Sequence, residues 1–125
     1  MTAKKKVLVI DDEQPFLDIM QEKLGKEGLE PLLAMGGEKG IEVALKEHPD
    51  LIVLDVLMPG MHGWSVYEKL RQDDWGRGVP VIILTNVTDK YRKEQGEKTG
   101  GYEYLVKTDV SLEEVIRKIR EKAGA

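Results

Sequence analysis

The sequence contains no cysteine, which excludes disulfide bonds, thiolate catalysis and zinc–thiolate sites. It also has no apolar run near the roughly 18 residues that a membrane span needs. The basic residues near the N-terminus precede an apolar stretch, Val7–Ile10, that is too short for a signal peptide. These absences predict a cytoplasmic protein that does not associate with membranes.

Neither sign of charge dominates the sequence. Lys and Arg number 19 and Asp and Glu number 23, which gives a net charge of −4, with both signs interspersed. Direct binding to nucleic acid is not expected, because it requires a basic face. With 125 residues, of which 41% are apolar, the chain is long enough for one domain with a buried core. We expect residues 1–125 to form that single domain.

One apolar stretch, Leu51–Leu54, is followed by Asp55 and shortly afterwards by a Met-Pro-Gly break. A short and uninterrupted apolar run is typical of a strand covered on both faces, as in a parallel sheet. The Pro and Gly then take the chain out of the sheet. Asp55 is therefore predicted at the carboxyl end of a buried strand, the edge where open α/β sheets bind ligands.

Predicted strands and helices alternate along the whole chain. Apolar runs predict strands over residues 6–10, 29–35, 51–54, 79–84 and 102–106, and Pro31 places the second strand at a sheet edge. Helices are predicted between and after them, around residues 15–24, 41–45, 64–71, 89–99 and 112–119. This alternation predicts an α/β fold with a parallel sheet, helices on both faces and right-handed crossovers.

The predicted helices differ in their apolar content. Their apolar faces are Phe16, Ile19, Met20 and Leu24 in the first helix, Ile41, Ala44 and Leu45 in the second, and Leu112, Val115, Ile116 and Ile119 in the last. Residues 111–114 have the pattern of a capping box. The fourth helix is nearly all charged, and Tyr91 is its only large apolar residue. We therefore expect this helix to be weakly held and to open early.

Four of the five predicted strands end in residues that can carry chemistry, namely Asp11 and Asp12, Asp55, Thr85 and Lys107. Parallel strands bring their carboxyl ends to one edge, so these residues should meet there. Three carboxylates in one place repel one another, and their oxygens suit Mg²⁺. An ammonium and a hydroxyl beside the metal would form a clamp for a phosphoryl group. A carboxylate in that clamp could be the nucleophile and form an aspartyl-phosphate.

Each of these residues also has a purely structural explanation. An Asp after a strand most often caps a turn or a helix, and a Thr there is a good strand residue. A single Lys is usually solvated. The combination favours a functional site, because the four strand ends carry complementary chemistry on one edge.

The same residues, in the same order, carry a resemblance to a known family. The matching segments are Val7–Glu13, Asp50–Asp55, Met58–Met61, Val81–Thr85 and Tyr104–Lys107. Together they resemble the receiver domain of two-component response regulators, over roughly residues 5–122. The resemblance implies a flavodoxin-like (βα)5 fold with sheet order 2-1-3-4-5. It implies a phosphorylation-controlled signalling switch rather than an enzyme.

The resemblance also implies a phosphorylation site with its metal ligands. Asp55 would accept a phosphoryl group from the histidine of a sensor kinase or from a phosphotransfer protein. Asp12 and Asp55 would bind Mg²⁺ directly, together with the backbone carbonyl of Leu57. Asp11 would act mostly through a water.

Four further residues would complete the switch. Lys107, Thr85 and the backbone N–H of Asn86 would contact the phosphoryl oxygens, and Tyr104 would be the switch aromatic. On phosphorylation Thr85 would move toward the phosphate and Tyr104 would turn inward. The surface of the fourth helix, fifth strand and fifth helix would then change, and a downstream protein would read it. The expected state is a monomer or a weak, phosphorylation-dependent dimer.

The sequence departs from the family pattern at several positions. Thr108 follows Lys107, where the family usually has a proline after a cis peptide. His62 replaces the usual aspartate after the Met-Pro-Gly-Met segment, and we expect it to be an exposed loop residue. Leu57 and Val87 place apolar side chains beside the site. We expect slow hydrolysis of the phosphorylated state, because neither side chain orients a water.

Three other functions fit this edge less well. A metal-dependent phosphatase that forms an aspartyl-phosphate would have a second Asp two residues after the first, where Asp55 is followed by Val56 and Leu57. A nucleotide or flavin binder would have a glycine-rich loop after the first strand, where this chain has three consecutive acids. A degenerate receiver that acts by binding alone would not need the complete set of acids, threonine and lysine.

Overall fold

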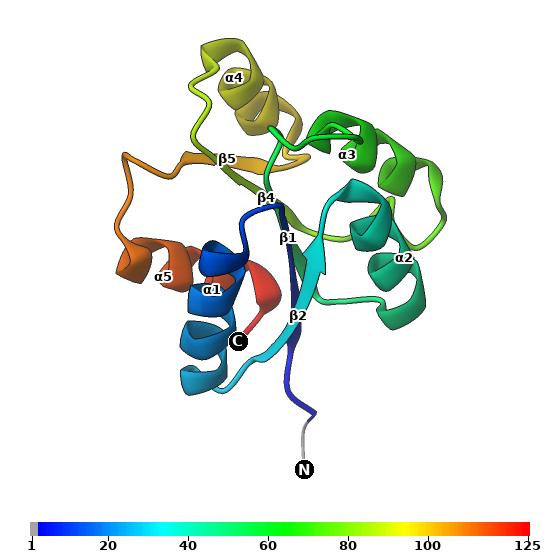
Figure 1. Cartoon of the computed structure of the whole chain (residues 1–125). Helices are drawn as coiled ribbons and strands as arrows, with labels where there is room; N and C mark the ends of the chain where they lie inside the picture. The colour runs from blue at the N-terminus through cyan, green and yellow to red at the C-terminus, as the bar shows by residue number, and fades with distance from the viewer. Residues whose placement is uncertain (1–2) are drawn as a thin grey trace.

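The computed structural model describes residues 3–125, and strands and helices alternate throughout this range (Figure 1). The strands are β1 (Lys6–Asp11), β2 (Glu30–Met35), β3 (Leu51–Leu54), β4 (Val81–Thr85) and β5 (Glu103–Val106). The helices are α1 (Gln14–Lys26), α2 (Gly37–Glu47), α3 (Gly63–Gln72), α4 (Lys90–Thr99) and α5 (Leu112–Ala123).

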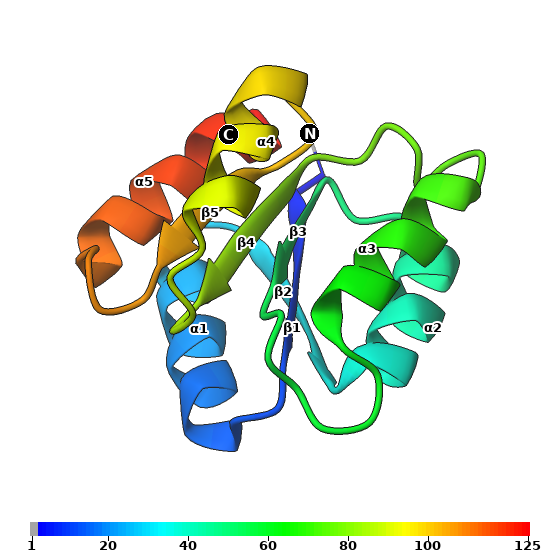
Figure 2. The same cartoon turned by 90° about the horizontal axis from the view of Figure 1, so that it is seen from above.

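The strands form one parallel sheet of order β2-β1-β3-β4-β5, as predicted. Helices α1 and α5 lie on one face of the sheet, and α2 and α3 lie on the other (Figure 2). β2 is at the edge, as Pro31 indicated. The α/β prediction, with helices on both faces, is therefore confirmed.

Two apolar clusters, one on each face, hold the helices to the sheet. Val7 and Val9 of β1 belong to the cluster under α1 and α5, whereas Leu8 and Ile10 belong to the cluster on the other side. This alternation follows from the pleat of a strand, in which successive side chains point to opposite faces. Because both faces are covered, the strand is apolar at every one of these positions.

The buried faces of two helices differ from the prediction. In α1 the buried residues include Leu17 and Met20, whereas Ile19 is 48% exposed. Ile19 is two positions after Leu17, and residues two apart point to different sides of a helix. In α2, Ala44 is buried but Leu45 is 42% exposed. In both helices the spacing of the apolar residues is compatible with more than one buried face. Packing against the sheet determines which face is buried.

The structure also shifts the start of β4 and shows how α5 is capped. β4 begins at Val81 rather than at residue 79, because Pro80 has no N–H to donate to the ladder. At the start of α5, the side chain of Ser111 accepts a hydrogen bond from the backbone N–H of Glu114 at 3.1 Å. This is one of the two bonds that make up a capping box. Within residues 3–125, no helix has the length and apolar character that crossing a bilayer requires.

Helix α4 is present, but it is not attached in the way that the sequence indicated. Tyr91 is 66% exposed and therefore does not anchor the helix. Among the α4 residues only Gly96 is buried. The helix ends at Thr99, and Gly100 caps it in the left-handed conformation, with φ of 69°.

Candidate functional site

Backbone hydrogen bonds align the carboxyl ends of neighbouring strands of the sheet. The backbone N–H of Asp55 donates to the carbonyl of Ile10 at 3.0 Å, so the ends of β3 and β1 are adjacent. The N–H of Lys107 donates to the carbonyl of Thr85 at 2.7 Å, which aligns the ends of β5 and β4 in the same way. The register of the sheet thus brings the predicted site residues to one edge.

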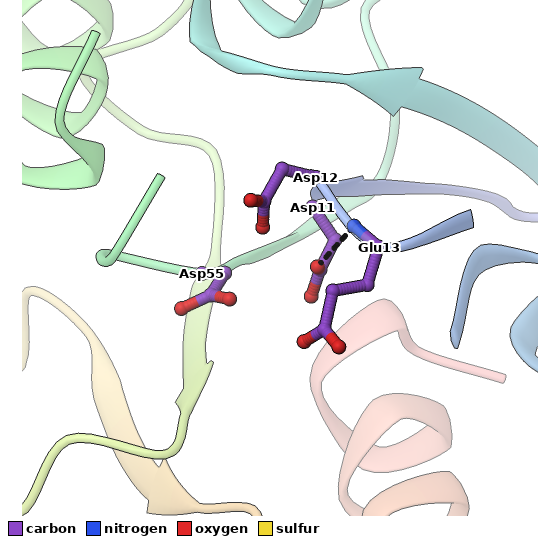
Figure 3. A group of neighbouring side chains, drawn as sticks. All are labelled: Asp11, Asp12, Glu13 and Asp55. Atoms are coloured by element: carbon purple, nitrogen blue, oxygen red, sulfur yellow. Dashed lines mark hydrogen bonds between the residues drawn. The ribbon is translucent and has the colours of Figure 1, made fainter. Parts of the chain in front are cut away.

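Four acidic side chains converge at this edge (Figure 3). Asp11, Asp12, Glu13 and Asp55 each offer a carboxylate oxygen, and these oxygens all lie within 4.8 Å of one another. Asp11 and Asp55 are almost fully buried, at 1% and 5% exposure. A set of carboxylates this close fits a hard divalent cation such as Mg²⁺, because a cation offsets their mutual repulsion.

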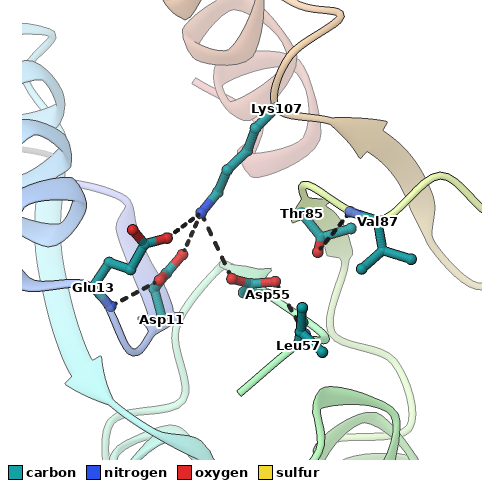
Figure 4. Close-up of polar contacts among 7 residues, drawn as sticks. All are labelled: Asp11, Glu13, Asp55, Leu57, Thr85, Val87 and Lys107. Carbon is teal, nitrogen blue, oxygen red and sulfur yellow. Dashed lines mark hydrogen bonds and ion pairs between the residues drawn. The ribbon is translucent and has the colours of Figure 1, made fainter. Parts of the chain in front are cut away.

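Lys107 supplies the positive charge at the site (Figure 4). Its Nζ lies 2.8 Å from Asp11 Oδ2, 3.6 Å from Asp55 Oδ2 and 3.8 Å from Glu13 Oε1. Burial by itself would lower the pKa of Lys107. The hydrogen bond to Asp11 and the charges of Asp11, Asp55 and Glu13 outweigh that effect and raise the pKa. The lysine is therefore held as an ammonium between the acids.

Asp55 is in an environment that opposes its charge. Burial raises the pKa of this carboxyl, and the nearby charge of Asp11 adds to the shift. The Thr85 hydroxyl, the backbone N–H of Leu57 (3.2 Å from Asp55 Oδ1) and the charge of Lys107 act in the opposite direction. A cation at the acidic cluster would further favour the carboxylate, which is the nucleophilic form.

Beside Asp55 the surface is hollowed, with room for a small anionic group. The hollow has a volume of about 440 Å³, and Asp12, Asp55, Leu57, Thr85 and Asn86 are among the residues that line it. Thr85 is fully buried, and its Oγ1 accepts a hydrogen bond from the Val87 backbone N–H at 3.4 Å. The hollow therefore places a hydroxyl and a carboxylate around one space.

Tyr104 lies behind this edge, not in it. Its ring is 4% exposed and its hydroxyl donates to the carbonyl of Val87 at 2.6 Å. Val87 is two residues after Thr85, so Tyr104 is connected to the loop that carries the site threonine. The expected switch aromatic is thus already turned inward in this structure.

Two of the family departures have clear structures. His62 is exposed, as expected, but it also caps α3, because its Nδ1 accepts from the Trp64 backbone N–H at 3.3 Å. No peptide bond within residues 3–125 is cis, so Lys107 and Thr108 are joined by a trans bond. Lys107 nevertheless reaches the acids.

Sequence reasoning did not assign a role at the site to Glu13 or Phe16. Glu13 belongs to the acidic cluster, and its position directly after Asp12 was the available signal. The Phe16 ring lies under Lys107, with Nζ 4.1 Å from the ring centroid. No pattern in the sequence connects Phe16 with Lys107, because the two residues come from different elements, and Phe16 was assigned only to the apolar face of its helix.

Comparison with known proteins decides the family. The family model described as "Response regulator receiver domain" matches residues 7–120. The chain belongs to this family. As a receiver domain it is a phosphorylation-controlled signalling switch, and receiver domains bind Mg²⁺ at an acidic pocket. The comparisons do not favour the phosphatase or the degenerate receiver.

Curated relatives of this receiver domain are longer than the chain itself. It is 38% identical over 104 residues to the probable transcriptional regulator ycf27 of Cyanophora paradoxa, a match that covers 83% of the chain and 42% of that protein. It is 35% identical over 102 residues to the response regulator PleD of Caulobacter vibrioides, covering 82% of the chain and 22% of PleD. The chain thus spans less than half the length of these relatives.

Solved structures share the fold of this receiver domain over nearly its full length. The chemotaxis protein CheY4 of Vibrio cholerae superposes with a TM-score of 0.84 at 28% identity, covering 95% of this chain and 98% of that one. The receiver domain of the Francisella response regulator 1452 gives a TM-score of 0.85 at 29% identity, covering 97% and 98%. The predicted flavodoxin-like architecture is confirmed by these neighbours.

Proposed function

We propose that Asp55 is the phosphoryl acceptor of this receiver domain, and that the donor is a phosphohistidine of a sensor kinase or a phosphotransfer protein. One observation carries the proposal. A 5% exposed carboxylate at a strand end lies 3.6 Å from a lysine ammonium, within a cluster of acids that suits a divalent cation. This combination provides a nucleophile, a counter-charge and a metal site in one place.

The proposed transfer is a displacement at phosphorus. A carboxylate oxygen of Asp55 forms a bond to phosphorus as the phosphorus–nitrogen bond of the donor breaks, and the electron pair stays on the imidazole nitrogen. Lys107, the Thr85 hydroxyl and the backbone N–H of Asn86 contact the phosphoryl oxygens and offset their charge. Mg²⁺, when bound by Asp12, Asp55 and the Leu57 carbonyl, with Asp11 acting through a water, would supply further charge neutralisation.

The output of the switch is proposed to be a protein contact. Thr85 moves toward the new phosphate, and this movement changes the loop through Val87 to which the Tyr104 hydroxyl is bonded. The surface formed by α4, β5 and α5 then changes for a downstream protein or a second copy of the chain. We propose that the domain works in the cytoplasm, as a monomer or as a weak phosphorylation-dependent dimer, and does not itself bind nucleic acid.

Incubation with acetyl phosphate and Mg²⁺, followed by mass spectrometry of the intact protein, tests the proposal. The wild type is expected to gain the mass of one phosphoryl group, and Asp55→Asn is expected to gain none. Asp109→Asn is the control, because this aspartate is exposed and lies beyond the end of β5. An unchanged mass in the wild type, or the same gain in Asp55→Asn, would contradict the proposal.

The lifetime of the phosphorylated state is proposed to be long. Leu57 is 62% exposed beside Asp55, and Val87 is half-buried near Thr85. Neither side chain can donate or accept a hydrogen bond, so neither orients an attacking water. Leu57→Asn and Val87→Glu are each expected to shorten the lifetime of the phosphoprotein in Mg²⁺. Lifetimes that neither substitution changes would remove the idea.

A further inference from the structure

The Lys107 ammonium has two kinds of neighbour. Three carboxylates surround it, of which Asp11 is the nearest at 2.8 Å. It also lies over the face of the Phe16 ring, whose centroid is 4.1 Å from Nζ. A cation over the face of an aromatic ring at this distance is attracted by the electron density of the ring.

Phe16 is placed for this contact by the first turn of α1. Pro15 precedes it in that turn, and the helix begins directly after the acidic residues of the site. The ring is only half-buried, at the edge of the cluster on the face of α1 and α5. Together with Ile19, Leu84 and Val110 it lines an apolar groove of about 260 Å³ that also contains Lys107. The side chain of Lys107 is 13% exposed as a result.

The carboxylate nearest to the ammonium belongs to Asp11 and not to the proposed phosphoryl acceptor. Nζ is 0.8 Å closer to Asp11 than to Asp55, as the distances of 2.8 Å and 3.6 Å show. A cation shared by the acids reduces their attraction for the lysine, because each carboxylate then has a second positive partner. The ring face does not bind a hard divalent ion, which takes oxygen ligands. Its attraction for the ammonium therefore persists.

We propose that Phe16 is a positioning residue, which holds the Lys107 ammonium beside Asp55 for phosphoryl transfer through the face of its ring. This proposal rests on the proposed function, since it concerns the same site. It differs from a packing role, because it depends on the aromatic face and on the charge of the lysine. Phe16 acts through Lys107 and does not itself contact the phosphoryl group.

The rate of phosphorylation by acetyl phosphate in Mg²⁺ tests the proposal, since the rate with this small donor does not depend on docking of a protein partner. Phe16→Leu keeps an apolar side chain but removes the ring, and is expected to be roughly 2- to 30-fold slower at a fixed donor concentration. Phe16→Tyr restores a ring face and is expected to recover the rate. Ile19→Ala is the control, because Ile19 lines the same groove without contacting Nζ. Thermal unfolding of each variant confirms that it is folded.

A double-mutant cycle separates positioning from packing. If Phe16 acts through the ammonium, Phe16→Leu has no further effect on the rate in a Lys107→Ala background. An equal slowing in both backgrounds would overturn the proposal. So would a Phe16→Leu rate within about 2-fold of the wild type, which is the lower end of a cation–π effect, or an Ile19→Ala variant that is as slow as Phe16→Leu.

Proton NMR tests the contact between Phe16 and Lys107 without phosphorylation or metal. Protons held over an aromatic face are shifted upfield by the ring current. The ε-methylene protons of Lys107 are therefore expected upfield of those of the exposed lysines in the wild type, and at ordinary positions in Phe16→Leu. The absence of this shift from the wild type would refute the ring contact. If the shift is present but acetyl phosphate does not modify the protein, the contact stands, and the proposed function and the positioning role both fail.

Discussion

The two helices that flank the end strand of the sheet, α4 and α5, are attached by different forces. α5 buries four residues, Val115, Ile116, Ile119 and Ala123. α4 is of similar length, but the only residue that it buries is Gly96. Burial of large aliphatic side chains stabilises a helix by roughly 1.5–3 kcal/mol each, and α4 has no such contribution.

Aromatic side chains outside the helix hold α4 instead. The ring of Tyr102 packs against Gly96, where an added Cβ would lie 2.6 Å from the ring. The Tyr102 hydroxyl donates to the backbone carbonyl of Arg92. The guanidinium of Arg92 lies 4.2 Å from the centroid of the Trp64 ring, and Trp64 stacks near Tyr104 at 6.4 Å. α4 is thus attached through aromatic side chains that pack against the core cluster on this face, and one of them, Trp64, lies near Tyr104.

This difference assigns different roles to the two helices. α5 is fixed to the sheet, so it can serve as the constant part of the proposed output surface. A few contacts lead from α4 through Trp64 and Tyr104 to Val87, and we expect a movement of that loop to shift α4. Elements that move in regulation are drawn from the weakly held parts of a fold. We therefore expect phosphorylation to change α4 more than α5.

The largest expected loss of stability follows from shortening a buried apolar side chain of α5. Ile119 is fully buried, so Ile119→Ala leaves a cavity and should lower the free energy of unfolding by about 2–5 kcal/mol. Tyr91→Ala removes the largest side chain of α4 and should change it by less than about 0.5 kcal/mol, because Tyr91 is exposed. Urea unfolding followed by circular dichroism measures both. Equal costs would show that the two helices are attached alike.

A clash introduced at the close contact between α4 and Tyr102 should have the next largest effect. Gly96→Ala places a Cβ 2.6 Å from both the ring and the carbonyl oxygen of Tyr102, and a backbone oxygen cannot easily move away. The clash should cost about 1–3 kcal/mol, more than the helix propensity of alanine returns. Gly25→Ala in α1 is the matched control, since nothing lies within 4 Å of its added Cβ, and it should be neutral or slightly stabilising. A Gly96→Ala variant as stable as Gly25→Ala would show that α4 does not rest on Tyr102.

A smaller effect is expected from loss of one hydroxyl. Tyr102→Phe keeps the ring but removes the hydrogen bond to the Arg92 carbonyl, at a cost of about 0.5–1.5 kcal/mol. Hydrogen exchange should become faster over residues 90–99 and remain unchanged in α5. In the wild type, α4 should already exchange faster than the central strands, and slow exchange in α4 would refute its weak attachment. Tyr91→Phe, on the exposed side of the same helix, should leave exchange unchanged.

The fold, and the proximity of the site residues at one edge of the sheet, could be predicted because both depend on local sequence patterns. Each buried strand is a short apolar run, and the residue that follows it must lie at the carboxyl edge of a parallel sheet. Asp55 follows Leu54 in this way, and Lys107 follows Val106. Topology alone then brings the acids and the lysine together, and no knowledge of side-chain packing is needed.

The failures concern contacts between residues far apart in the chain. Helical spacing did not distinguish Ile19 from Leu17, because only the neighbouring strands decide which face is buried. Tyr91 was predicted to anchor α4, but the anchor is Tyr102, which lies just before β5 and packs on a glycine. The contact of Phe16 with Lys107 likewise joins the first helix to the residue that follows the last strand. None of these pairs leaves a periodic signal in the sequence.

The smallest expected effect concerns an ion pair that α5 has and α4 lacks. Glu103 of β5 pairs with Lys118 at 2.8 Å and with Lys122 at 3.5 Å, both on α5. Burial alone would raise the pKa of Glu103, but the hydrogen bond and charge of Lys118, together with Lys122, outweigh burial and lower it. A carboxyl with a lowered pKa in the folded state stabilises the protein above its ordinary pKa, and this contribution is lost as the pH falls through the lowered value.

Glu103→Gln should therefore cost about 1 kcal/mol or less at neutral pH, because the pair is partly exposed. The difference from the wild type should shrink as the pH falls below about 4.3, the ordinary value for glutamate. Glu97→Gln is the matched change on α4, since Glu97 is exposed and makes no ion pair within residues 3–125. At neutral pH it should change the free energy of unfolding by less than Glu103→Gln does. Chemical unfolding of both variants at pH 7, and of Glu103→Gln from pH 3 to pH 7, measures this, and an equal cost of the two substitutions at pH 7 would mean that charge does not distinguish the attachment of α5 from that of α4.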